Sequence, residues 1–246
     1  MRFKNKIALV TGSTSGIGKK ILEKLIKEGC KVIGTSKENI LIKNKTKNLE
    51  YYKIDVTNEK EWKTLSINIK ARYKKIDILI NNAGIRLSGD IKSTSLSKWN
   101  HVINTNLTSV FLGCKYILPL LNKSKKPNIV NVASITSIRG VKNMLAYAAS
   151  KSALVTFTSS LALDLSKNKI RVNAVAPGAV DTYMVATLKK EINSKSIFDK
   201  RMKEAHPIGR IGKPEEIANL VCFLASEEAS FMTGVTVPVD GGRSIR

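Results

Sequence analysis

The sequence contains few of the residues from which disulfide frameworks, metal centres and membrane spans are built. Its three cysteines, Cys30, Cys114 and Cys222, are odd in number and far apart, and its two histidines, His101 and His206, are isolated. We therefore expect buried free thiols in a reducing compartment and no metal site. No apolar run approaches the ~20 residues that a transmembrane helix needs, so we expect no membrane association.

Linkers, repeats and low-complexity tracts are also absent. The six prolines and 15 glycines form no Pro/Gly/Ser-rich stretch, and no break in composition divides the chain. A strand pattern begins at Lys6 and leaves no room for a signal peptide. Hydrophobic residues make up 43% of the sequence, which is enough for a sizeable core. We expect a single α/β domain over residues 1–246 and a cytoplasmic location.

Acidic residues are scarce, because 19 Asp and Glu stand against 42 Lys and Arg, giving a formal net charge of +23. A basic surface can attract nucleic acid, an anionic cofactor or an acidic protein. The lysines are dispersed and do not gather around aromatic or RNA-recognition motifs, so a general compositional bias is favoured over a nucleic-acid role. An acidic protein partner stays open as the alternative.

Short apolar runs alternate with helical patterns along the whole chain. The predicted strands cover residues 6–11, 31–35, 49–54, 76–80, 128–133, 169–176 and 235–239. The predicted helices run up to residue 29, over 58–73, 95–122 and 145–166, and from residue 214, with a weak helical signal over 38–48. This alternation predicts a doubly wound parallel sheet of about seven strands with helices on both faces.

A glycine-rich turn joins the first strand to the first helix: Thr11-Gly12-Ser13-Thr14-Ser15-Gly16-Ile17-Gly18. Such a turn lets the backbone approach a pyrophosphate, and the helix N-terminus offers free N–H groups. The second strand ends in Ser36-Lys37 and lacks the carboxylate that would bond a ribose 2′-OH. Lys37 would suit a 2′-phosphate, so we favour NADP over NAD, although Lys37 could equally be a solvated lysine.

Polar residues also follow the third and fourth strands. Asp55 could accept a hydrogen bond from an adenine amino group, or it could cap the following helix. Asn81-Asn82-Ala83-Gly84 forms a turn that could hold the central strands or approach a cofactor ribose. Asn106 falls within a predicted helix, where asparagine usually faces solvent unless its side chain or a local kink serves a site.

Tyr147 and Lys151 lie four residues apart on a predicted helix and therefore share one face. A tyrosine ordinarily titrates near pH ~10, and a fixed positive charge within about 4–6 Å lowers that pKa. Together with Ser134, which ends the preceding strand, they could move a proton to or from a carbonyl or alcohol oxygen. The alternative is an ordinary helix face. These candidates gather at the carboxyl ends of the predicted strands, where parallel sheets bind cofactors.

Taken together, the motifs resemble the short-chain dehydrogenase/reductase family over nearly the full length. The matching residues are Thr11, Gly12, Gly16, Ile17, Gly18, Asp55, Asn81, Asn82, Ala83, Gly84, Asn106, Ser134, Tyr147, Lys151, Pro177 and Gly178. The resemblance implies a Rossmann fold, a nicotinamide cofactor and a homotetramer. It also implies hydride transfer to a carbonyl carbon while a proton is delivered to the oxygen.

The resemblance assigns a role to each of four residues. Tyr147 is expected to be the general acid or base, and Ser134 to orient and polarise the substrate oxygen. Lys151 is expected to bind the nicotinamide ribose and lower the Tyr147 pKa, and Asn106 to hold a water in a proton relay. Cofactor contacts are expected at Gly12, Ser13, Ser15, Gly16, Ile17, Gly18, Ser36, Lys37, Asp55, Val56, Asn82, Ala83, Gly84, Tyr147, Lys151, Pro177, Gly178, Val180 and Thr182.

Four further stretches look most like 3-oxoacyl-[acyl-carrier-protein] reductases within that family: residues 176–178, 207–210, 213–216 and 239–242. The expected activity is therefore NADP-dependent reduction of a 3-oxoacyl thioester on acyl carrier protein, in fatty acid biosynthesis. Because sugar and polyol dehydrogenases share these stretches, dehydrogenation of a sugar, polyol or other secondary alcohol is the alternative. A non-catalytic nucleotide- or nucleic-acid-binding protein is disfavoured by the complete catalytic set.

Two regions are expected to shape substrate binding. Residues 182–212 have mixed polarity and are expected to form a mobile segment that covers the substrate. Five lysines could form a docking patch for an acidic carrier protein near the site, or could be solvated charges: Lys123, Lys125, Lys126, Lys167 and Lys169. The segment of residues 37–48 is shorter and richer in lysine than the helix that the family usually has at this place.

Overall fold

The computed structural model describes residues 1–38, 47–192 and 194–246. The weak helical signal expected over residues 38–48 lies, apart from its two ends, outside the described residues.

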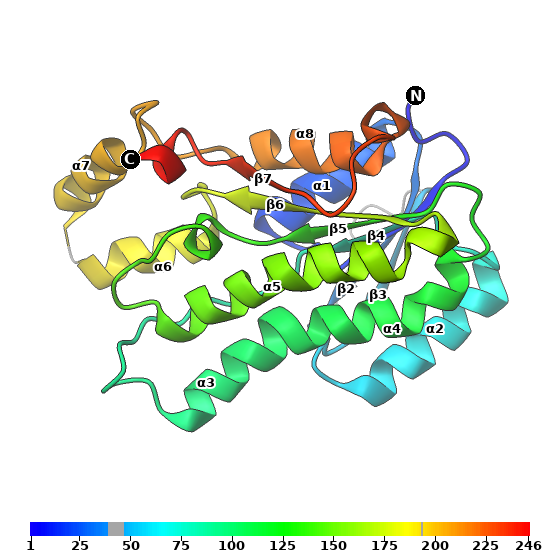
Figure 1. Ribbon diagram of the computed structural model, residues 1–246, viewed down its shortest axis with the longest axis horizontal. Coiled ribbons are helices and arrows are strands. Elements are labelled where there is room, and N and C mark those ends of the chain that lie inside the picture. The colour runs from blue at the N-terminus through cyan, green and yellow to red at the C-terminus, as the bar shows by residue number, and fades with distance from the viewer. Residues whose placement is uncertain (39–46, 193) are drawn as a thin grey trace.

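Within the described residues, seven parallel strands form one sheet in the order β3-β2-β1-β4-β5-β6-β7 (Figure 1). The strands are β1 Ile7–Val10, β2 Lys31–Ser36, β3 Leu49–Lys53, β4 Ile78–Asn81, β5 Asn128–Val132, β6 Arg171–Pro177 and β7 Thr236–Val239. The order reverses between β1 and β4, and open α/β sheets bind ligands beside such a reversal. The predicted doubly wound parallel sheet is confirmed.

Helices cover both faces of the sheet (Figure 1). They are α1 Gly16–Lys27, α2 Glu59–Tyr73, α3 Leu96–Ile103, α4 Ser109–Leu121, α5 Leu145–Asp164, α6 Tyr183–Ile192, α7 Lys195–Ala205 and α8 Pro214–Ala225. α1 and α8 lie together on one face, and α2, α4 and α5 lie on the other. α6 and α7 extend beyond the ends of the strands.

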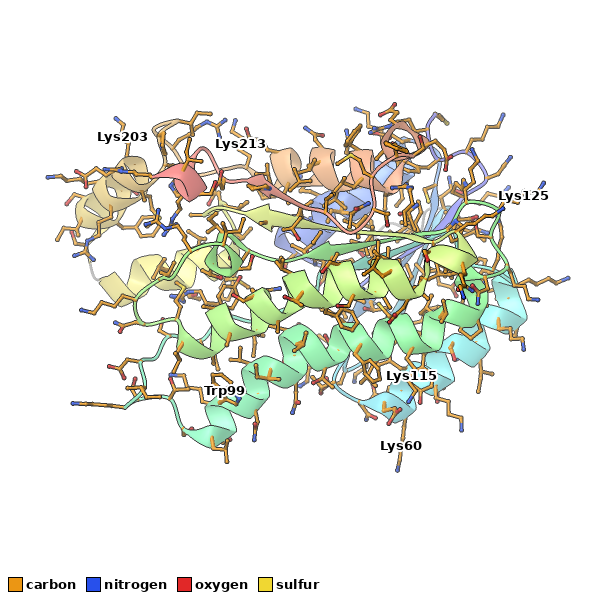
Figure 2. All side chains as sticks on the ribbon, in the orientation of Figure 1. Lys60, Trp99, Lys115, Lys125, Lys203 and Lys213 are labelled. Carbon is orange, nitrogen blue, oxygen red and sulfur yellow. The ribbon has the colours of Figure 1, made fainter. Side chains whose placement is uncertain are left out.

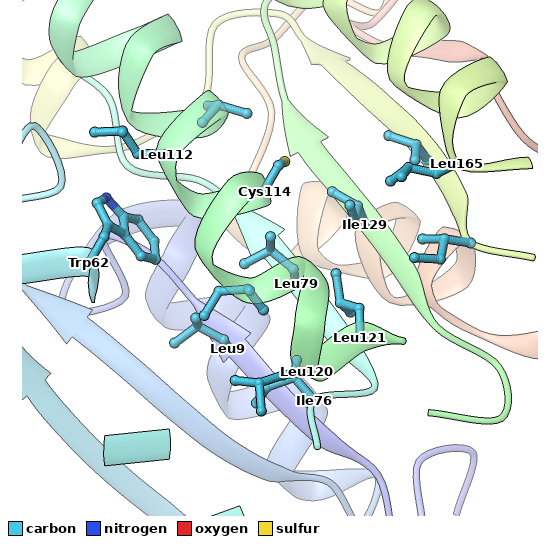
Figure 3. Packing of buried hydrophobic residues seen from close by; sticks show 14 of the residues in the cluster. Leu9, Trp62, Ile76, Leu79, Leu112, Cys114, Leu120, Leu121, Ile129 and Leu165 are labelled. Carbon is cyan, nitrogen blue, oxygen red and sulfur yellow. The ribbon is translucent and has the colours of Figure 1, made fainter. Parts of the chain in front are cut away.

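Buried strand side chains alternate between the two helical layers, as the period of a β-strand requires. Leu9, Leu79 and Ile129 point toward the layer of α2, α4 and α5, where Trp62 and Cys114 join them (Figure 3). Their neighbours along each strand pack against α1 and α8. All three cysteines are free and buried, as predicted, and the reducing compartment expected for them stays a prediction. In the part of the chain described, no helix is long and apolar enough to cross a membrane.

The helix predicted over residues 95–122 is interrupted by a π-helical turn, Asn104–Thr108, between α3 and α4. Phe111 on α4 is 47% exposed, whereas most apolar side chains of this helix are buried. α4 faces the sheet with Val110, Cys114 and Ile117. Phe111 follows Val110 directly and is therefore turned about 100° away from that line.

Candidate active site

A cleft of about 750 Å³ opens at the carboxyl ends of β1 to β6. Its outer end is lined by the glycine-rich turn after β1 and by the residues that follow β2 and β3. Its inner end is lined by the turn after β4, by Ser134 and Tyr147, and by residues of α6. Of all the site residues predicted from the sequence, Ser13 and Asn106 alone are missing from the lining.

Two glycines let the glycine-rich turn fold tightly and pack closely against the turn after β4. Gly12 has φ +60°, and a Cβ there would lie 2.9 Å from the Ala83 Cα. A Cβ on Gly18 would clash with the Gly12 carbonyl and the Asn82 side chain. Asn82 Nδ2 donates to the carbonyls of Thr11 and Gly12, both at 2.9 Å, and so joins the turn after β4 to the turn after β1.

The N-terminus of α1 fits an anionic group. Its N-cap residue, Ser15, makes no side-chain hydrogen bond to the first turn, and no acidic residue stands there. The first N–H groups of the helix therefore have no side-chain acceptor, and they carry the positive end of the helix dipole. Gly16, Ile17 and Gly18 of this turn all line the cleft. The geometry suits the pyrophosphate of a dinucleotide.

Ser13 is a correction to the predicted set of cofactor contacts. Its side chain is fully buried, and both its Oγ and its N–H bond the carbonyl of Thr35 on β2. The turn therefore aims this hydroxyl into the sheet and away from the cleft. Ser13 fixes the turn to β2, and its side chain is not available to a cofactor.

Lys37 and Asp55 form an ion pair at the outer end, with Lys37 Nζ 2.8 Å from Asp55 Oδ2. Burial raises the pKa of Asp55, but hydrogen bonds from Lys37 and Thr57 outweigh it and lower the pKa to about 2. The proposed capping role of Asp55 is wrong, because the N-cap of α2 is Asn58, whose side chain accepts from Lys60 N. Both Lys37 and Asp55 line the cleft.

Tyr147 and Lys151 converge on the inner end, as the four-residue spacing predicts. The Lys151 ammonium is buried and donates to the carbonyl of Val132, the last residue of β5, at 2.7 Å. Burial lowers the pKa of Lys151 to about 8. Gly84 passes close to two of these side chains, because a Cβ there would lie 3.2 Å from Asn106 Oδ1 and 3.5 Å from Lys151 Nζ.

The pKa of Tyr147 differs in direction from the prediction. Burial raises it, while a side-chain hydrogen bond with Ser134 and the charge of Arg86 lower it. The net direction is upward, because burial outweighs the hydrogen bond with Ser134 and the charge of Arg86; the lowering of this pKa by Lys151 stays a prediction. The phenol is almost fully buried, and the nearby ammonium is directed at a main-chain carbonyl.

Asn106 lies behind the wall of the cleft and is fully buried. Its Oδ1 accepts from the N–H of Ile85 at 2.8 Å, and its Nδ2 donates to the carbonyl of Ile85 at 2.9 Å and to Ser150 Oγ at 3.0 Å. Ser150 Oγ donates in turn to the carbonyl of Tyr147 at 2.7 Å. The side chain therefore links the turn after β4 to α5, and its direct role is to position both.

Two residues of the site were missed from the sequence. Arg86 lines the cleft, and its positive charge lowers the pKa of Tyr147. Its position directly after Gly84-Ile85 could have indicated this placement from the sequence. His206 is buried, and its Nε2 accepts from the N–H of Ala179 at 3.1 Å, which holds the turn after β6 that carries Gly178. No sequence pattern near His206 predicts that contact.

The predicted lysine docking patch does not lie near the cleft of the same chain. Lys123, Lys125 and Lys126 precede β5, and Lys167 and Lys169 precede β6. They lie at the amino ends of these strands, whereas the cleft is at the carboxyl ends. Figure 2 shows Lys125 at the opposite end of the molecule from Lys203 on α7.

The segment 182–212 lies beside the cleft and contributes to its wall. It forms α6 and α7, and the lining includes Thr182, Tyr183, Met184, Val185 and Thr187. Val180, just before it, is joined by a β-bridge to Gly212 at its far end. Both ends of the segment are thus anchored to the turn after β6.

Comparison with known proteins extends over the whole chain. The family described as enoyl-(acyl carrier protein) reductase matches residues 12–244. The 3-oxoacyl-[acyl-carrier-protein] reductase FabG of Thermotoga maritima is 36% identical over 249 residues, covering 98% of this chain and 99% of that protein.

Solved structures also match this chain over nearly its full length. The ligand-free aldohexose dehydrogenase (AldT) of Thermoplasma acidophilum is 39% identical with a TM-score of 0.91, covering 99% of this chain and 95% of that chain. A short chain dehydrogenase family protein from Francisella tularensis is 34% identical with a TM-score of 0.91, covering 98% and 99%.

Proposed function

Because the chain belongs to the short-chain dehydrogenase/reductase family and is an oxidoreductase, we propose that it reduces the 3-oxo group of an acyl thioester on acyl carrier protein, with NADPH as its cofactor. The observation that carries this proposal is a buried phenol beside Ser134 and Lys151 at the inner end of a nucleotide-sized cleft. The likeness to FabG of Thermotoga maritima supplies the substrate class.

The residues present fit a nicotinamide dinucleotide. The glycine-rich turn and the first turn of α1 would hold its pyrophosphate. Lys37 would provide positive charge for a 2′-phosphate, and Asp55 would accept from the adenine amino group. Lys151 would bind the nicotinamide ribose. When bound, this cofactor supplies the hydride.

The chain's own contribution is to place and release a proton. Ser134 and Tyr147 would both hydrogen-bond the substrate oxygen and orient the carbonyl. Tyr147 is the proton donor, because a phenol is in its acid form at neutral pH and burial here favours that form further. As Tyr147 loses its proton, the hydrogen bond with Ser134 and the charges of Lys151 and Arg86 stabilise the phenolate.

A second candidate is oxidation of a sugar or other secondary alcohol. It is favoured by the likeness to the Thermoplasma acidophilum aldohexose dehydrogenase at 39% identity. The polar side chains of His101 and Thr105 in the cleft lining would also suit a hydroxylated substrate. In that direction Tyr147 must act as a base, which its raised pKa opposes at neutral pH.

A substrate panel tests the proposal directly. Acetoacetyl-acyl carrier protein, aldohexoses and simple ketones or alcohols are compared by cofactor absorbance with each of the two nicotinamide cofactors. We expect the highest kcat/KM for the acetoacetyl thioester, and a preference of about tenfold or more for NADPH over NADH, equivalent to ~1.4 kcal/mol. Preference for an aldohexose would reject the substrate class, and preference for NADH would reject the role of Lys37.

Two variants serve as controls for this panel. Tyr147→Phe is expected to lower kcat by a factor of about 10² to 10⁴ while NADPH binding survives, because only the proton donor is lost. Tyr116→Phe removes a surface hydroxyl that bonds Glu59, and it should leave kcat unchanged. Near-normal turnover in Tyr147→Phe would refute its assignment as the proton donor.

A further inference from the structure

Arg86 stands at the inner end of the cleft, together with Ser134 and Tyr147. The residues on either side of it, Ile85 and Leu87, pack in one cluster with Tyr147 and Val102. This packing sets the main chain of Arg86 beside the phenol. The effect of the guanidinium charge on the pKa of Tyr147 agrees with that placement.

The turn that carries Arg86 is fixed at both ends. At its start, Asn106 bonds both the N–H and the carbonyl of Ile85. At its end, Gly89 donates to the carbonyl of Asn143 at 2.9 Å and accepts from the N–H of Leu145 at 3.1 Å. Leu145 begins α5, the helix of Tyr147. The main chains of Arg86 and Tyr147 are therefore fixed relative to each other, so a ligand that contacts both residues binds to a preorganised pair.

The Arg86 side chain is also oriented. Its Nη2 donates to Ser88 Oγ at 3.1 Å, and the main-chain carbonyl of Ser88 accepts from Lys98 Nζ. A guanidinium presents several N–H donors in a plane and matches a carboxylate or carbonyl oxygen better than an apolar chain. A simple ketone has a single oxygen, so when that oxygen lies at Ser134 and Tyr147 no acceptor is left for the guanidinium.

We propose that Arg86 is the residue that determines substrate specificity: its guanidinium binds a second oxygen of the substrate, on the carbonyl separated from the reacting ketone by one methylene. When the ketone oxygen lies at Ser134 and Tyr147, the thioester carbonyl of a 3-oxoacyl group would fall within reach of Arg86. The site then prefers compounds with two carbonyls in this relation over simple ketones. This inference rests on the proposed function and names the chemical feature that the site recognises.

Two variants separate recognition from general electrostatics. Arg86→Gln removes the charge and shortens the donor, whereas Arg86→Lys keeps the charge and loses the planar donor group. The substrates are acetoacetyl-CoA and the monoketone 2-pentanone, each with NADPH. Lys92→Gln is the matched control, because it removes one positive charge from an exposed lysine outside the cleft.

We expect Arg86→Gln to lower kcat/KM for acetoacetyl-CoA by about 30- to 100-fold, because the second carbonyl of this substrate loses its hydrogen-bond donor. We expect kcat/KM for 2-pentanone to fall by less than about threefold, because this substrate has no second carbonyl. Arg86→Lys should fall between wild type and Arg86→Gln, and Lys92→Gln should match wild type. An equal loss with both substrates would overturn the inference, because it would mean that Arg86 acts only through Tyr147. Retention of wild-type selectivity would overturn it as well.

Binding measurements distinguish failure of this inference from failure of the proposed function. Acetylacetone carries two carbonyls in the required relation and can be titrated by calorimetry into enzyme saturated with NADP⁺. If acetoacetyl-CoA is not reduced by wild type but acetylacetone binds about tenfold or more weakly to Arg86→Gln, the proposed function fails and the role of Arg86 stands. Equal affinity for acetylacetone in the two proteins would reject the role of Arg86 whatever the substrate proves to be.

Discussion

Burial dominates the titration of the two side chains at the inner end of the cleft. It raises the pKa of Tyr147 and lowers that of Lys151 to about 8, so each shift favours the uncharged form. Tyr147 therefore remains a phenol at neutral pH and can donate its proton. Lys151 remains largely an ammonium ion below pH ~8, where its charge can stabilise the phenolate that forms.

These pKa shifts predict an alkaline limit to the reduction. The pKa of Lys151 is lowered to about 8. The positive charge of Lys151 is therefore still present at neutral pH, but it is lost as the pH rises through about 8. We expect kcat/KM for the reduction to be constant between about pH 6 and 7.5 and to fall above about pH 8. Initial rates across this range, with saturating NADPH, measure the profile. A profile that stays flat beyond about pH 9.5 would show that the charge of Lys151 is not needed.

The π-helical turn between α3 and α4 lies behind the wall of the cleft and positions the segments that carry Arg86 and Tyr147. It brings Asn106 into the interior, where its side chain bonds Ile85 and Ser150. Ile85 leads directly to Arg86, and Ser150 bonds the carbonyl of Tyr147. One buried amide therefore sets the relative position of the turn after β4 and of α5.

Replacing this amide tests the role of the turn. Asn106→Ala leaves the N–H of Ile85 and its other partners without their hydrogen bonds, and we expect the free energy of unfolding to fall by about 2 to 4 kcal/mol. Asn104→Ala is the matched control in the same turn, because Asn104 is exposed and should change stability by less than about 0.5 kcal/mol. Urea unfolding of both variants measures the difference. Equal stability of the two would show that the buried hydrogen bonds add nothing.

At the scale of the whole molecule, positive charge is the strongest feature. The formal net charge is +23, and the labelled lysines, among them Lys60, Lys125 and Lys203, lie at widely separated places around the outline of the molecule (Figure 2). Most ion pairs in the described residues involve partly exposed side chains, such as Lys126 with Glu227 and Arg210 with Glu216. Such pairs contribute little individually, so repulsion among the surplus cations opposes folding.

This repulsion predicts that added salt stabilises the protein. Raising the ionic strength from about 0.01 M to about 0.15 M shortens the Debye length from about 30 Å to about 8 Å. We expect Tm to rise by about 3 to 6 °C, equivalent to one or two kcal/mol for a chain of this size. Calorimetry in sodium chloride at fixed pH measures the shift. A Tm that falls with salt would mean that the attractive pairs outweigh the repulsion.

The expected homotetramer stays a prediction. Phe111 on α4 and Leu163 on the neighbouring α5 leave large apolar side chains exposed on one side of the described molecule, and Phe231 does so before β7. The cytoplasmic location likewise stays a prediction.

The sequence alone determined the features that depend on short stretches of chain. Alternation of apolar runs and helical patterns predicted the parallel sheet, because a buried strand and an amphipathic helix each carry their own period. Gly12 and Gly18, Asp55 and Gly84 could be assigned to one rim, because turns between β and α elements of a parallel sheet fall at the carboxyl ends of its strands. The spacing of Tyr147 and Lys151 followed from helix geometry.

Only the tertiary structure decided what those groups touch and how they titrate. Ser13 points into the sheet, Asn106 bonds a turn 21 residues away, and Arg86 stands beside Tyr147 because separate segments pack together there. The pKa of Tyr147 rises because the fold buries its phenol. Contacts between distant segments and the exclusion of water are properties of the packed chain, and no local pattern in the sequence encodes them.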